Sequence, residues 1–102
     1  MLAAARSRKE AVAYRLTGEL FENLAALQAA QRTAALTQTS LLPQAEATLQ
    51  AALAGYENGR VDFATLLDAQ RQIRTSRQNL LKAEVEVQVR LAAIEKLLGE
   101  DL

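Results

Sequence analysis

Asp68 and Arg71 are the two residues of this sequence whose types and spacing best suit an electrostatic site. On a helix, side chains three positions apart lie on one face, and a carboxylate near the helix start meets the favourable end of the helix dipole. Repeated around a symmetry axis, such pairs would set a ring of carboxylates beside a ring of guanidiniums that closes a pore. The simpler interpretation is a solvated pair within one helix, worth about 0.2 to 0.5 kcal/mol.

Other chemistry is strongly limited by composition. The chain has no Cys and no His, which removes disulfides, thiolate nucleophiles, imidazole bases and nearly every transition-metal site. Lys plus Arg number 12, as do Asp plus Glu, so no net charge draws the chain toward nucleic acid. We therefore expect no enzyme activity, no cofactor, no metal site and no nucleic-acid partner.

The apolar content predicts helices that pack closely. Half of the 102 residues are hydrophobic but only 4% are aromatic, and Ala and Leu dominate. No apolar run approaches the roughly 18 residues of a membrane-spanning helix. The start, residues 1–6, becomes charged too early for a secretory signal. We expect either a cytoplasmic protein or a piece of a larger one.

The first arm is predicted as a helix over about residues 2–58. Leu residues recur at three- and four-residue spacing, and a second apolar row follows. Between the rows lies Pro43, before which Ser40 could cap a new helix. We favour one continuous helix kinked at Pro43, because no Gly or polar turn cluster accompanies it. The first row is Leu16, Leu20, Leu24 and Leu27; the second is Leu42, Ala45, Leu49, Ala52 and Tyr56.

The second arm is predicted as a helix over about residues 63–98. Its apolar residues recur every seven positions, which is typical of a coiled-coil seam, with small residues beside them. Gly99 is the expected C-cap, leaving residues 100–102 frayed. The seven-residue row is Leu66, Ile73, Leu80, Val87 and Ile94, and the small residues are Ala69, Ser76 and Ala83.

Residues 59–62 form a turn with consistent local signals. Gly59 can adopt the left-handed conformation that closes the first helix, and Asp62 can accept hydrogen bonds from the amides that open the second. Val61 and Leu66 have the spacing of a hydrophobic staple. So short a connection makes the helices antiparallel. The fold class is all-α: one domain, residues 1–102, forming a long coiled-coil-like α-helical hairpin.

The two arms differ in predicted length, at roughly 85 Å and roughly 55 Å. The N-terminal third of the first arm therefore lacks a partner in the chain, although its Leu16 to Leu27 row requires one. A two-helix hairpin also buries only one stripe of each helix. We expect self-association into a helical bundle, or a parent protein that supplies further helices.

Four sequence words in the same order and spacing resemble the C-terminal periplasmic hairpin of TolC-like outer-membrane efflux channels. They are Leu42-Pro43-Gln44-Ala45, Tyr56-x-x-Gly59, Leu66-Leu67-Asp68-Ala69-Gln70-Arg71 and Leu97-Leu98-Gly99. In that family three protomers, each with two hairpins and β-barrel strands, close a periplasmic tunnel. The resemblance implies a tunnel fragment from the outer membrane and periplasm, here its soluble periplasmic part. The wording looks closest to the branch serving proton-driven heavy-metal or drug pumps.

The resemblance also implies a docking site at the turn. Gly59, Arg60 and Val61 would meet a periplasmic adaptor (membrane fusion) protein and, through it, an inner-membrane pump, with Tyr56 and Asp62 bracing the turn. From its spacing, Tyr56 is also a core aromatic completing the second row, whose hydroxyl could bond across the tip.

The family likeness further implies that Asp68 and Arg71 gate the export of small molecules or metal ions, in a homotrimer. A different interpretation keeps the hairpin but not the pore: a structural coiled-coil or helical-bundle interaction module, for example an adaptor-type hairpin. We expect the fragment itself to form a homo-oligomer.

Overall fold

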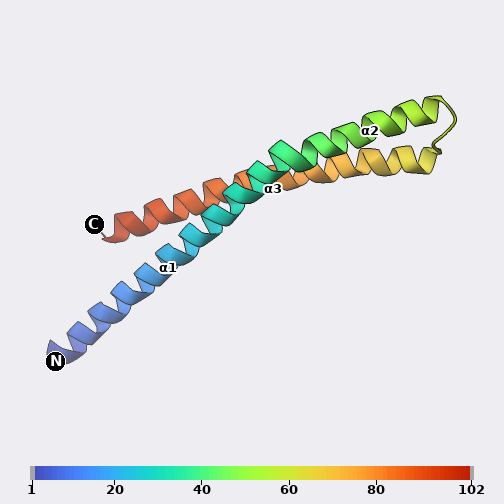
Figure 1. Ribbon diagram of the computed structural model, residues 1–102. Coiled ribbons are helices and arrows are strands. Elements are labelled where there is room, and N and C mark those ends of the chain that lie inside the picture. The colour runs from blue at the N-terminus through green and yellow to red at the C-terminus, as the bar shows by residue number, and fades with distance from the viewer. Residues whose placement is uncertain (1, 102) are drawn as a thin grey trace.

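The computed structural model describes residues 2–101 and shows an antiparallel helical hairpin (Figure 1). The first arm consists of α1 (Leu2–Leu36), a π-helical turn η1 (Thr37–Leu41) and α2 (Leu42–Glu57). The second arm is α3 (Phe63–Asp101). The described chain measures 82 × 19 × 14 Å, and the two termini lie at the end opposite the turn. The predicted all-α hairpin is confirmed.

The first arm is continuous through Pro43, as the favoured interpretation predicted. Leu41 and Leu42 keep helical backbone angles, so the alternative prediction, a new helix capped by Ser40, is wrong. The irregularity takes the form of a π turn, in which the amide of Leu42 donates to the carbonyl of Thr37, five residues back. Pro43 follows directly after this turn and has no amide hydrogen, so the helical bond at its own position is missing.

The helix ends differ from the predicted ones in one important place. The first arm ends at Glu57, one residue before the predicted boundary, whereas α3 runs through Gly99 to Asp101. The predictions that the helix stops at residue 98 and that Gly99 caps it are therefore wrong. Gly99 does not take positive φ, and an interior Gly weakens a helix by only about 1 kcal/mol without ending it. Leu102 lies outside the described residues.

The predicted seam of α3 faces the first arm. Leu66 and Ile73 are buried, and the other three members of the seven-residue row are half-buried. Ala69 is only 2% exposed, so this small side chain is almost completely covered by the first arm. The buried hydrophobic residues are Leu27, Ala30, Ala45, Ala52, Leu66, Ala69, Ile73 and Ala83.

The Leu16 to Leu27 row has a partner within the chain, so the expectation that it lacks one is wrong. Leu27 is buried, and Leu16 and Leu20 line a groove with Leu97 and Leu98 of α3. The reach of α3 explains the difference, since its last turns lie beside this row. Residues 2–15 are exposed throughout, and in Figure 1 this part of α1 diverges from the end of α3.

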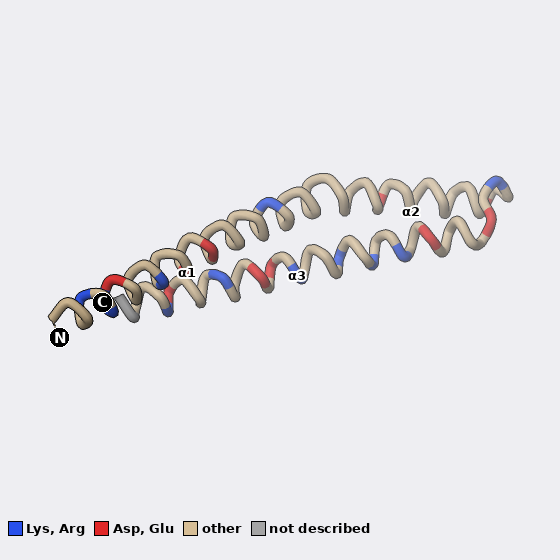
Figure 2. The backbone as a smooth tube through the Cα atoms, turned by 90° about the horizontal axis from the view of Figure 1, so that it is seen from below, with Lys and Arg blue, Asp and Glu red and all other residues tan. Residues whose placement is uncertain are grey.

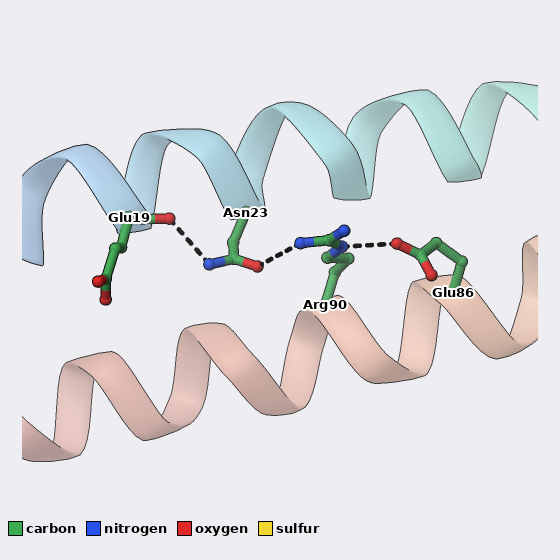
Figure 3. Close-up of polar contacts among 4 residues, drawn as sticks. All are labelled: Glu19, Asn23, Glu86 and Arg90. Atoms are coloured by element: carbon green, nitrogen blue, oxygen red, sulfur yellow. Dashed lines mark hydrogen bonds and ion pairs between the residues drawn. The ribbon is translucent and has the colours of Figure 1, made fainter.

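One polar contact joins the two arms near their open end (Figure 3). The Arg90 Nη1 group donates to Asn23 Oδ1 at 2.9 Å, and its Nε donates to Glu86 Oε1 at 2.6 Å. Asn23 in turn donates to the Glu19 carbonyl at 2.8 Å. Among the described residues, the Arg90–Asn23 bond is the sole side-chain hydrogen bond between the arms. Because a part-buried polar pair is satisfied in one alignment only, this contact favours a single register.

Replacing Asn23 by Ala should lower the stability of the hairpin. The variant removes the acceptor of Arg90, which is worth about 1 kcal/mol for a hydrogen bond of this kind. We expect the thermal midpoint, followed by far-ultraviolet circular dichroism, to fall by about 4 to 8 °C. Asn79→Ala, at an exposed position of α3, is the control and should leave the midpoint almost unchanged. Equal midpoints for the two variants would contradict a role for the contact.

Candidate functional site at the hairpin tip

The turn is closed by backbone hydrogen bonds around Gly59. Gly59 has φ +73°, the left-handed conformation that the sequence predicted. Its amide donates to the carbonyl of Tyr56 at 3.1 Å, and the amides of Arg60 and Val61 donate to the carbonyl of Gly55 at 2.7 and 3.1 Å. This pattern satisfies carbonyls that the end of α2 would otherwise leave unpaired. The backbone conformation of the tip is therefore set by these hydrogen bonds and by Gly59.

Gly55 shapes the turn, a role that the sequence patterns did not predict. A Cβ atom at this position would collide with Val61 Cγ2 and lie 3.2 Å from Val61 Cβ. Glycine thus allows Val61 to pack, half-buried, against α2. Leu66, the other residue of the expected staple, packs with Ala52 and Ala69. A second Gly one helical turn before the capping Gly59 is the signal that could have revealed this contact.

Asp62 caps α3, as predicted. Its Oδ1 accepts from the Thr65 amide at 2.9 Å and from the Thr65 hydroxyl at 2.7 Å. Its carbonyl accepts from the Leu66 amide at 3.2 Å. These bonds from Thr65, that of the side chain first, lower the pKa of Asp62 below its ordinary value of 3.8. The carboxylate therefore stays ionised at neutral pH and holds the start of α3.

Tyr56 contacts the other side of the tip through its ring. It is 45% exposed, so the expectation that it completes the second apolar row as a core aromatic is wrong. Its ring meets Phe63 edge-on, with centroids 6.2 Å apart and planes at 62°. The inward stripe has already ended with Ala52 and the half-buried Gly55, so Tyr56 falls beyond it. The tip thus presents two exposed aromatic rings, since Phe63 is 61% exposed.

Asp68 and Arg71 lie further along α3, about 9 Å or more from Asp62 along the helix axis. The Asp68 Oδ1 atom is 3.7 Å from Arg71 Nη1, and the two side chains are 68% and 66% exposed. Both line a groove between the arms, opposite Gln44 and Thr48. Within one chain they form the solvated i, i+3 pair of the simpler interpretation.

One family model matches nearly the whole chain, including the tip. The family model described as outer membrane efflux protein covers residues 2–100. The chain belongs to the outer membrane efflux protein family. This agrees with the resemblance to TolC-like channels and identifies a component of an outer-membrane efflux channel, in a family of transport proteins. The heavy-metal or drug branch stays a prediction, since the match is to the family as a whole.

Neither the curated proteins nor the solved structures include a significant match to this member of the outer membrane efflux protein family. Over residues 2–101, no helical stretch has both the length and the apolar content that crossing a bilayer requires. Efflux proteins of this family work with adaptor proteins and pumps and form oligomers. The tip and the Asp68–Arg71 pair are the candidate sites for those functions.

Acid should destabilise the hairpin partly through Asp62. Because its folded-state pKa is lowered, its capping stabilises the fold above the ordinary carboxylate pKa and is lost as pH falls through the folded-state value. In Asp62→Asn the amide oxygen can still accept from Thr65 but does not titrate. We expect the fall in thermal midpoint between about pH 5 and pH 2 to be smaller in this variant than in the wild type.

The matched control for this acid titration is Glu57→Gln, which removes an exposed carboxylate close to the same turn. Its acid profile should differ from that of the wild type less than the profile of Asp62→Asn does. If Asp62→Asn and the wild type lost the same number of degrees over this range, Asp62 would not be the group responsible.

Proposed function

We propose that this hairpin forms the periplasmic end of an outer-membrane efflux tunnel, docks an adaptor protein through its tip and gates the export of small molecules or metal ions. The observation that carries the proposal is the match of the whole hairpin to the efflux family, combined with a structurally specified, exposed tip. The tip lies at the far end of the molecule from both termini (Figure 1). A parent protein can therefore hold the hairpin at one end and present the other.

The chemistry of the tip suits a protein partner. Arg60 is exposed at the apex, beside the exposed rings of Tyr56 and Phe63. Arg and aromatic residues are the types that most often dominate binding energy at protein interfaces. The hydrogen bonds to Gly55 and Tyr56 fix the backbone at the apex, so little ordering would accompany binding. These features support docking of a periplasmic adaptor, which would link the channel to an inner-membrane pump.

Reversing the charge of Arg60 should weaken docking. In the channel that contains this hairpin, Arg60→Glu should reduce site-specific cross-linking to the periplasmic adaptor. If Arg60 dominates the contact, the affinity for the adaptor should fall by roughly 30-fold. The matched control is Arg6→Glu, which makes the same change at an exposed position near the opposite end. Helix content should be unchanged in both variants. Cross-linking as strong in Arg60→Glu as in the control would refute docking at the apex.

The proposed gate rests on the exposed Asp68–Arg71 pair. Each side chain keeps about two thirds of its surface free, so each can reach a neighbouring protomer. In a homotrimer the three pairs could exchange partners around the axis as bidentate ion pairs. The gate would therefore close only in the assembled channel. In a single chain the same two residues form an ordinary surface ion pair. The efflux family favours this conduit over a coiled-coil module without a pore.

Neutral replacements should open the gate. Combining Asp68→Asn with Arg71→Gln removes both charges at nearly constant size, and we expect a higher single-channel conductance of the assembled channel in planar bilayers. Arg77→Gln, at an exposed position of the same helix, is the matched control and should leave conductance unchanged. Unaltered conductance in the double variant would refute the gate and leave adaptor docking untouched.

A further inference from the structure

The first arm changes its helical register once, at η1. On either side of this turn the residues facing α3 follow one another at steps of three and four. From Thr37 to the next inward apolar residue, Leu42, the step is five, although Ser40 between them is also half-buried. The amide of Leu42 donates to the carbonyl of Thr37. Before the turn the inward residues are Leu27, Ala30, Ala34 and Thr37; after it they are Leu42, Ala45, Leu49 and Ala52, all buried or half-buried.

The opposing stripe on α3 has no such step. Its inward residues keep a seven-residue period from Leu66 to Ile94, without a π turn. A first arm without a π turn would continue the same period past Thr37 and bring Gln44 and Thr48 into the interface. In the structure both are exposed, and Ala45 and Leu49 take the inward positions.

We propose that the π turn is a one-residue register insertion, set by the apolar pattern on both sides of it and not by Pro43. One extra residue rotates the following helix by about 100°. This rotation turns Ala45 and Leu49 inward and places Gln44 and Thr48 in the groove beside Asp68. Pro43 lacks the amide hydrogen for one helical bond, and its ring crowds the carbonyl of Thr39 within η1. A kink can relieve both effects, so a proline does not by itself require that the stripe move by one residue.

The insertion therefore sets the rotation of α2, the part of the first arm next to the tip, relative to α1. Thr37, at the junction, is 2% exposed, so the turn is packed against the interface and is not a surface irregularity. Side chains on α2, including the groove wall opposite Asp68 and Arg71, point where they do because of this one residue. The inference stands whether or not the tip docks an adaptor.

Two matched deletions in the Pro43→Ala background test the inference. Gln38, within the π turn, and Gln28, within α1, are both exposed glutamines. Deleting Gln38 should convert the turn into regular helix while keeping both stripes inward, so the thermal midpoint should equal or exceed that of Pro43→Ala. Deleting Gln28 should rotate the upstream row away from α3 and lower the midpoint by about 10 °C or more. Equal effects of the two deletions, in either direction, would overturn the proposal.

A distance measurement separates the two causes of the π turn. Spin labels at Thr48 and Thr75, exposed residues on opposite walls of the same groove, report the rotation of α2. If the apolar pattern sets the turn, Pro43→Ala alone should leave the electron–electron distance distribution unchanged. If proline sets it, the substitution should straighten the helix, rotate Thr48 and shift the distribution, which would overturn the proposal.

Discussion

The structure depends on one constraint: two stripes of small and aliphatic side chains must face each other along two long helices. Many of the buried positions are Ala, such as the 2% exposed Ala69, so the interface buries little area per residue and must be continuous to stabilise the pair. Any slip between the arms would replace these residues by polar neighbours. Two features maintain this alignment. The π turn rotates α2 so that its apolar residues face α3, and the Asn23–Arg90 hydrogen bond joins the two arms in one register.

The tip solves a different problem, because the chain must reverse direction without leaving backbone groups unpaired. Gly59 supplies the left-handed backbone and Gly55 the space for Val61. The side chain of Asp62 then accepts a hydrogen bond from the Thr65 amide in the first turn of α3. The turn residues hydrogen-bond to and pack against one another, so the local sequence is enough to order the apex. An apex of this kind can meet a partner without first being ordered by it.

Charge acts locally in this molecule. Figure 2 shows basic and acidic residues interspersed along the arms, in line with equal numbers of the two signs. The middle of α3 is the most uneven stretch, where Arg71, Arg74 and Arg77 follow one another on exposed positions. Ion pairs on such a surface contribute little to stability in one chain. Their importance, including that of Asp68 and Arg71, would arise where neighbouring chains exclude water from them.

Periodicity and capping are local signals, so the sequence alone predicts the hairpin, the turn at Gly59, the cap at Asp62 and the inward row of α3. It also indicates the efflux family. Features that depend on the opposite arm emerge only when the two helices pack together. These are the partner of Leu16 and Leu20, the packing of Val61 on Gly55, and the bond from Arg90 to Asn23. The five-residue step at η1 belongs with them, since it has meaning only against the unbroken row of α3. The exposure of Tyr56 and the continuation of α3 through Gly99 could likewise not be predicted from the local sequence. In both cases the surrounding helix outweighs the preference of a single residue.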